Sequence, residues 1–113
     1  LIQIGSGSVT STGYNATGGG CINNAAPAVA PSTAGFLLFN DTAADIRSGN
    51  IAISYVGSNI YVQSHTMGGI GGRNTTYWGG GTVTLGGVLD RVRITTVNGT
   101  DTFDAGSINI LYE

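Results

Sequence analysis

The sequence predicts an all-β domain: an antiparallel β-sandwich, jelly-roll-like, with about eight short strands and glycine-rich loops. Three observations lead to this prediction. Helical periodicity is almost absent, short runs alternate apolar and polar residues, and 20 of the 113 residues are glycine while only 9% are charged. Glycine adopts positive φ at tight turns, and Asn, Ser and Thr satisfy backbone groups locally. A chain of this length is expected to form one domain, residues 1–113.

The strand candidates outside the two predicted hairpins are short and bounded by turn residues. They are Leu1–Ile4, Ser8–Thr12, Gly35–Asn40 and Thr82–Leu85. The Ala/Pro-rich stretch Asn23–Gly35 is predicted to be a loop or an extended connector, because proline donates no backbone hydrogen bond. The best helical candidate is Asn40–Gly49, one or two turns that Asn40 or Asp41 could cap.

The segment Ile51–His65 is predicted to be a β-hairpin with a two-residue type II′ turn at Gly57-Ser58. On one face the resulting register pairs Tyr55 with Ile60, Ile53 with Val62, and Ile51 with Ser64. That face is apolar and the opposite face is mixed, as expected for a half-buried antiparallel sheet.

A second hairpin is predicted near the C-terminus, within a meander from about Asp90 to Tyr112. Asn98-Gly99 is a strong type I′ turn signal, because both turn positions require positive φ. Pairing outward from this turn places Ile94 opposite Phe103 and Arg93 opposite Asp104. Arg93 and Asp104 are therefore expected to form a structural cross-strand ion pair.

No catalytic or metal site is predicted. Asp101 and Asp104 fall on opposite faces of one predicted strand, so the two carboxylates are not expected to act together; a calcium site is the weaker alternative. His65 is the only histidine, no acidic residue or cysteine lies near it at a ligand spacing, and a G-x-S-x-G motif is missing. We therefore expect a protein that is not an enzyme and holds no cofactor.

Composition also argues against two classes of partner. The four basic residues are scattered arginines, which cannot form the stripe that tracks a nucleic-acid backbone. No apolar run approaches the ~20 residues of a membrane span. Cys21 has no internal disulfide partner, and we expect it to be a small buried residue, with a reactive or intermolecular cysteine as the alternative. Because the first residue is Leu1, the domain is expected to be the C-terminal part of a longer chain.

The glycine-rich segment Met67–Gly81 is the candidate ligand site, because a loop this rich in glycine is costly to order. In extended chain Tyr77 and Trp78 point to opposite sides, so one of them is expected to face solvent, where it could stack on a sugar ring. The alternative is that Trp78 caps the core and the glycines only permit turns. The candidate ligand-binding residues are Tyr77, Trp78, Arg73, Asn74 and the neighbouring His65.

Three stretches carry a resemblance to a known class of protein. The segment Leu89–Glu113 (LDRVRITTVNGTDTFDAGSINILYE) resembles the closing segment of small β-sandwich modules in the appendage, or tail-fibre-like, proteins of tailed bacteriophages. Ile2–Gly7 (IQIGSG) resembles their opening strand, and Ile53–His65 (ISYVGSNIYVQSH) fits their middle. The glycine-rich segment Met67–Gly81 departs from the pattern and inherits no binding role.

The resemblance implies an antiparallel sandwich displayed on the virion surface, as a homotrimer with outward loops available for host contact. It adds no catalytic residues. The expected function is a virion structural protein, an appendage tip domain that contacts a host-surface glycan and other virion proteins. One alternative is a purely structural capsid-decoration or fibre-capping module. The weaker alternative is a carbohydrate-binding domain of a secreted bacterial protein.

Overall fold

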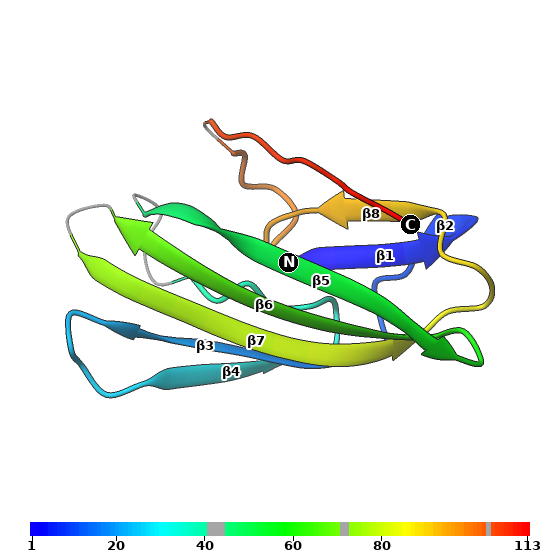
Figure 1. Cartoon of the computed structure of the whole chain (residues 1–113), viewed down its shortest axis with the longest axis horizontal. Coiled ribbons are helices and arrows are strands. Elements are labelled where there is room, and N and C mark those ends of the chain that lie inside the picture. Colours follow the sequence, from blue (N-terminus) through cyan, green and yellow to red (C-terminus); the bar gives the residue numbers. More distant parts are fainter. Residues whose placement is uncertain (41–44, 71–72, 104) are drawn as a thin grey trace.

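The described part of the chain forms two antiparallel β-sheets and no helix, which confirms the predicted all-β sandwich class. This computed structural model describes residues 1–40, 45–70, 73–103 and 105–113. The strands are β1 (Ile2–Ser6), β2 (Ser8–Val9), β3 (Asn15–Ile22), β4 (Ala28–Ser32), β5 (Ile46–Gly57), β6 (Ile60–Ile70), β7 (Asn74–Thr84) and β8 (Arg91–Ile94). The small sheet has the order β2-β1-β8 and the large sheet the order β4-β3-β7-β6-β5. Figure 1 shows the small sheet lying against one half of the large one.

The hydrophobic core lies where the two sheets overlap. Ile2 and Ile4 of β1 are buried against the inner face of the large sheet, and the rings of Tyr14 and Phe36 meet edge to face with centroids 5.0 Å apart. The remaining buried members of this core are Ala16, Tyr61, Val83 and Leu85. Each fully buried large apolar side chain contributes roughly 1.5–3 kcal/mol, so this cluster accounts for the association of the two sheets.

The hydroxyl of Tyr14 joins the core to the start of the chain. It accepts a hydrogen bond from the backbone N–H of Ile4 at 2.8 Å and donates to the carbonyl oxygen of Thr10 at 3.0 Å. Burial raises the pKa of Tyr14 above its ordinary value, so the hydroxyl stays protonated and keeps its donor. A buried backbone N–H is thus satisfied at a point where β1 has no strand partner for it.

The four short strand candidates and the Ala/Pro stretch correspond only in part to strands. Leu1–Ile4 overlaps β1, Ser8–Thr12 overlaps β2, and Thr82–Leu85 contains the end of β7. Gly35–Asn40 forms only a bridge, in which Phe36 pairs with Ile2. The Ala/Pro stretch contains β4, an edge strand, where Pro31 is tolerated because an edge leaves one side of the backbone unpaired.

The helical prediction is wrong where the structure describes it. Ile46–Gly49 opens β5, while residues 41–44 lie outside the described part of the chain. The physical reason is pairing: β5 pairs with β6 from Ile46 onward, and such tertiary pairing overrides a weak local helical signal.

The predicted hairpin at Ile51–His65 exists as β5 and β6, but the turn and the register predicted for it are each wrong by one residue. The turn lies at Ser58-Asn59, where φ is 51° and 58°, so both positions adopt the left-handed conformation of a type I′ turn. An irregularity between Tyr55 and Gly57 then shifts the pairing.

The shifted register exchanges the two faces of β6 relative to β5. Ile53 pairs with Gln63 and Ile51 pairs with His65, so both polar side chains lie on the buried face. Val62, which the sequence placed in the apolar face, is 37% exposed on the other side. A slip of one residue has this effect because side chains alternate strictly along a strand.

The predicted C-terminal meander is wrong. Arg91–Ile94 forms β8, but it pairs with β1, and Ile94 lies opposite Ile2 rather than Phe103. The described residues after β8 contain no strand. The chain bends at Asn98-Gly99, but only Gly99 has positive φ (73°), so the predicted type I′ turn does not form.

The Asn98 side chain explains why this bend does not start a hairpin. Its Oδ1 accepts hydrogen bonds from the backbone N–H groups of Thr100 (3.0 Å) and Asp101 (3.2 Å). These two donors are therefore engaged locally, and local side-chain bonds compete with a strand ladder in this way. The predicted partner of Arg93, Asp104, lies outside the described residues; the Arg93 guanidinium donates to Oε1 of Gln3.

Candidate functional site

The large sheet has two faces with different chemistry, and the candidate residues divide between them. The inner face is the one that packs on the small sheet, and the outer face is the opposite one, which carries Trp78. As predicted from alternation, Tyr77 and Trp78 point to opposite sides: Tyr77 is fully buried and Trp78 is 36% exposed. The segment Met67–Gly81, predicted to be a loop, instead consists largely of the ends of β6 and β7 that face each other.

Glycines are required in these strands because other atoms occupy the space of their side chains. A Cβ on Gly79 would lie 2.5 Å from Cε1 of His65 and 2.6 Å from the carbonyl oxygen of Thr17. A Cβ on Gly20 would lie 2.5 Å from Cδ1 of Tyr77. The rings of His65 and Tyr77 therefore lie on backbone that has no side chain of its own. The glycines serve packing on the inner face rather than loop mobility.

Tyr77 anchors a buried polar group on the inner face. Its hydroxyl donates to Oδ2 of Asp45 at 2.8 Å, and the guanidinium of Arg47 lies 4.8 Å from the centre of its ring. Arg47 also lies 3.5 Å from the same carboxylate oxygen, and the Asp45 side chain is almost fully buried. Because these contacts close the ring off from solvent, Tyr77 holds the end of the sheet together and presents no surface to a ligand.

His65 is likewise turned inward, away from the outer face. It is 4% exposed, and its Nδ1 lies 3.0 Å from the amide nitrogen of Gln63. Whether Nδ1 accepts or donates in this contact depends on the tautomer of the neutral ring. Burial lowers the pKa of His65 below its ordinary value, which favours this neutral form.

Asn74 and Arg73 lie at the end of the large sheet where β7 begins. The backbone N–H of Asn74 donates to Oδ1 of Asn23 at 2.9 Å, and the N–H of Asn23 donates to the carbonyl oxygen of Asn74 at 2.9 Å. These bonds tie the β3–β4 turn to β7. Asn74 is exposed, and Arg73, directly before it, is half-buried. Of the candidate residues, Trp78 and Asn74 thus belong to the outer face, while Tyr77 and His65 belong to the inner face.

On the outer face Trp78 has small neighbours on both adjacent strands. It lies opposite Thr66 of β6 and Gly19 of β3, and beyond Gly19 lies Val29 of β4, whose methyl group occupies the space over that glycine. The indole therefore stands above its surroundings instead of being enclosed by equally large side chains. Trp78 and Val29 form an apolar strip across three strands.

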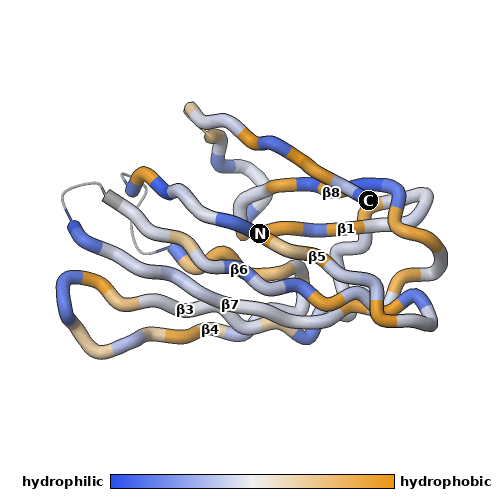
Figure 2. The backbone as a smooth tube through the Cα atoms, viewed as in Figure 1, coloured by the Kyte–Doolittle hydropathy of each residue, from blue (hydrophilic) through white to orange (hydrophobic). Residues whose placement is uncertain are grey.

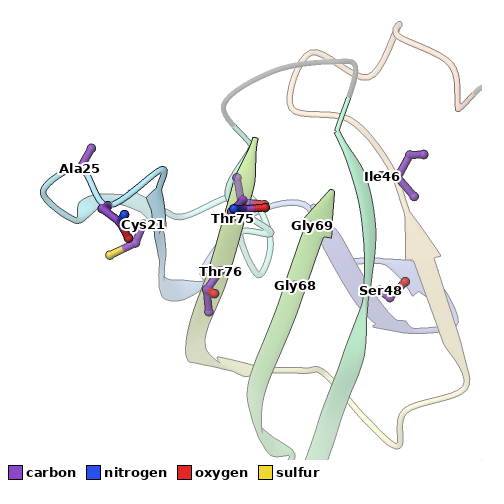
Figure 3. Close-up of a pocket in the computed structure, with 10 residues that line it drawn as sticks. Cys21, Ala25, Ile46, Ser48, Gly68, Gly69, Thr75 and Thr76 are labelled. Carbon is purple, nitrogen blue, oxygen red and sulfur yellow. The ribbon is translucent and has the colours of Figure 1, made fainter. Parts of the chain in front are cut away.

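A depression of about 830 Å³ lies on the outer face. It begins at Thr76, two residues before Trp78 in β7 and on the same face. Side chains of Ser48, Thr76 and Cys21 line it from three different strands, with Gly68 between Ser48 and Thr76 (Figure 3). A second depression of about 420 Å³ borders the hairpin β5–β6 and is lined by Asn50, Ala52, Ser64 and Thr66, among others. Sequence reasoning missed these hydroxyl and amide side chains.

Cys21 is half-buried in the wall of the larger depression. The prediction that Cys21 is buried is therefore met only in part, because the residue lies on the outer face. Within the described residues, no group of three or more His, Cys, Asp or Glu side chains could hold a metal ion. No helix in that part of the chain is long and apolar enough to cross a membrane.

Comparisons with protein-family models, curated proteins and solved structures gave no match to this chain. The outer face is therefore interpreted from its own geometry. It offers a ridge with one exposed aromatic ring, flanked by two shallow depressions with neutral hydrogen-bonding side chains. Such a surface can bind a polar ligand that has apolar faces.

Proposed function

We propose that this chain is a non-enzymatic recognition module that binds a glycan across the outer face of its large sheet. The observation that carries the proposal is the exposed indole of Trp78 between Thr66 and Gly19, beside two depressions lined by hydroxyl and amide groups. A sugar ring has an apolar C–H face that stacks on an indole and hydroxyl groups that exchange hydrogen bonds with Ser, Thr and Asn. Both kinds of contact are available within one face.

The biological setting that we propose is the tip of a bacteriophage appendage, where the module contacts a glycan on the host surface. This setting is supported by the resemblance of Leu89–Glu113 and Ile2–Gly7 to the closing and opening segments of appendage modules. A sandwich with a binding face on one sheet suits display on a particle, because the opposite sheet remains available for contacts with other virion proteins.

The test is the substitution Trp78→Ala in the purified domain. We expect it to abolish adsorption to host cells or to immobilised glycans, while the domain unfolds at nearly the same temperature, because the indole is partly exposed and lies outside the core cluster. Val97→Ala, which truncates another exposed apolar side chain, serves as the matched control and should change neither property. Unchanged adsorption by folded Trp78→Ala protein would contradict the proposal, and so would unfolding of that variant, which would make Trp78 a core residue.

A second candidate function, a structural module within an assembly, is favoured by a different observation. Large apolar side chains in the segment after β8 are 63–88% exposed: Phe103, Ile108, Ile110, Leu111 and Tyr112. Figure 2 shows these apolar stretches running outside the large sheet. Ile108, Ile110 and Tyr112 alternate as in a strand with one buried face, and the sheet edges β5 and β8 are open. The occupant that we propose for this segment is the sheet edge of a second copy of the chain.

A further inference from the structure

Among the described strands of the large sheet, none places an acidic side chain or an arginine or lysine on the outer face. The sequences of β3, β4, β6 and β7 contain no Asp, Glu, Lys or Arg, and β5 contains only Arg47. Arg47 belongs to the inner face, because it pairs with Gly69, which pairs with the buried Thr75. His65, the one histidine, is also directed inward. Along these described strands, a ligand on the outer face would therefore meet the indole, neutral polar groups and uncharged apolar side chains such as Ile46 and Ala52.

We infer that the ligand of this face is an uncharged glycan, bound as a chain longer than one sugar ring; this inference rests on the proposed function. An anionic sugar would have to give up part of the hydration of its carboxylate or phosphate, and this loss is offset only where a cation or several donors replace the water. The outer face has no such cation. The hydroxyls of Thr66, Thr76 and Ser64 both donate and accept, which matches the hydroxyl groups of a neutral sugar.

The length of the site follows from the spacing of β7. One face of β7 contains the positions of Thr76, Trp78 and Gly80. The distance along the strand from Thr76 to Gly80, four residues later, is about 13 Å. The depression at Gly68 begins beside Thr76, and the second depression includes Thr66, the direct neighbour of Trp78. One ring stacked on Trp78 would leave both depressions empty. A chain of several sugars would place its neighbouring rings in them.

Gly68 provides a variant that alters the site without disturbing the fold. A Cβ at this position meets no atom within 4 Å, and its φ is not one of the positive values found at turns. The substitution Gly68→Val therefore adds bulk to the floor of the larger depression while it favours a strand conformation. Arg73 provides the opposite control, because it directly precedes Asn74, which lines that depression, and it is the basic residue of the sequence next to β7.

The experiment is a fluorescence titration, since Trp78 is the only tryptophan and reports on the site directly. The probes are a panel of hexasaccharides, neutral (glucose, mannose or galactose units) and acidic (galacturonate or hyaluronan units), with the corresponding monosaccharides. Titrations are made at about 20 mM and about 500 mM NaCl, because salt screens exposed charge pairs at the higher concentration. The variants are Gly68→Val and Arg73→Gln, both of which keep the Trp78 reporter.

We expect a neutral hexasaccharide to bind with a Kd that changes less than about twofold with salt or with Arg73→Gln, since no charge pair contributes. Gly68→Val should weaken binding about tenfold or more, and the monosaccharide should bind at least about tenfold more weakly than the hexasaccharide. Binding of an acidic probe that falls with salt and with Arg73→Gln would overturn the inference and leave the proposed function standing. If no probe of either class binds, both the inference and the proposed function fail.

Discussion

At the scale of single residues, Gln3 and Tyr14 place buried polar atoms against specific partners from distant parts of the chain, whereas Oε1 of Gln63 and Nε2 of His65 are buried without a hydrogen-bond partner. Gln3 accepts from Arg93 and donates from its amide nitrogen to the carbonyl oxygen of Ala34 at 2.6 Å. Tyr14 bonds two backbone groups of the N-terminal segment. Each such group would cost free energy if it were left unpaired in the interior. These residues therefore matter for stability although they carry no function of their own.

Tyr14→Phe tests this argument. The substitution keeps the ring and its contact with Phe36 but removes the oxygen that accepts from the buried N–H of Ile4. We expect the free energy of unfolding to fall by about 1–3 kcal/mol, the cost of an unsatisfied buried donor. Urea denaturation measures the change. Tyr112→Phe, at an exposed position, is the matched control and should be neutral. An equal effect of both substitutions would show that the hydrogen bond does not matter.

His65 makes stability depend on pH. Its pKa in the folded protein lies below the ordinary value of 6.5 because the ring is buried, and its pKa in the unfolded chain is close to that value. The unfolded chain therefore binds more protons below about pH 6.5. We expect the contribution of His65 to the free energy of unfolding to be constant at higher pH and to fall as the pH drops from about 6.5 toward the folded pKa.

The measurement is the urea midpoint between about pH 8 and pH 5, for the native chain and for His65→Gln. The fall below about pH 6.5 should be smaller in the variant, while both proteins keep the loss that begins nearer pH 8, because burial also lowers the pKa of the Leu1 amine from 8.0. Asp90 does not contribute there, since the side-chain hydrogen bond from Arg91 lowers its pKa to about 2, and its effect belongs to a more acidic range. If both proteins lose stability equally over this window, His65 is not the responsible group.

At the scale of elements, the glycines of β3 and β7 determine how closely strands and rings approach. Gly18 of β3 pairs with Gly79 of β7, and a Cβ on Gly18 would lie 2.3 Å from the carbonyl oxygen of Leu37. The backbone after Phe36 can therefore lie directly on the inner face. His65 occupies the space over Gly79 in the same way.

Gly79→Ala is expected to destabilise the domain by about 1–3 kcal/mol or more, because the added methyl group meets backbone at Thr17 as well as the His65 ring. Gly68→Ala is the matched control in the neighbouring strand, where the methyl group points into open space. It should leave stability unchanged or raise it slightly, since alanine restricts the unfolded chain. Thermal unfolding of both variants checks the prediction. Equal stability of the two would mean that packing does not require glycine at position 79.

The sequence predicted elements better than it predicted their partners. Alternation and turn residues were sufficient to predict the hairpin at Ile51–His65 and the opposite directions of Tyr77 and Trp78. The register of that hairpin was not predictable, because it depends on an irregularity between Tyr55 and Gly57 and on positive φ at Ser58-Asn59. The C-terminal meander failed because Asn98 engages the backbone donors of its own turn.

In the candidate site, too, the sequence predicted individual features better than it predicted which residues lie beside them. Alternation predicted that one of Tyr77 and Trp78 faces solvent, but it did not say which of the two. The neighbours of Trp78, Thr66 and Gly19, could not be predicted, because they are set by the pairing of β7 with β6 and with β3, and β3 is more than fifty residues away in the chain. Long-range register decides which side chains share a face, and local patterns do not contain it.

At the scale of the whole molecule, the two sheets overlap over only part of the large one. The apolar core fills the overlap, and the buried polar group of Asp45, Arg47 and Tyr77 closes the other end of the inner face. The outer face thus lies on the side of the large sheet away from the core and from this polar group. The apolar side chains of the segment after β8 are exposed. The proposed recognition role and the proposed assembly role therefore involve separate parts of the molecule.

Ile110→Ser together with Leu111→Ser tests the assembly role. If this segment pairs with a second copy, the native chain should be oligomeric, with a homotrimer as the expected state, and the double variant should be a folded monomer, since serine removes the apolar surface that association would bury. Light scattering after size-exclusion chromatography measures the mass. Asn109→Ser is the control and should retain the native mass. A monomeric native chain would contradict this role.

The most direct test of the central claim is a map of amide chemical-shift changes in the ¹⁵N-labelled domain on titration with the hexasaccharide that binds best. We expect changes on the outer face, at the Trp78 indole N–H and at Thr66, Thr76 and Gly68. We expect no change at Asp45 or in β1. Changes confined to the segment after β8 or to the small sheet would contradict this claim.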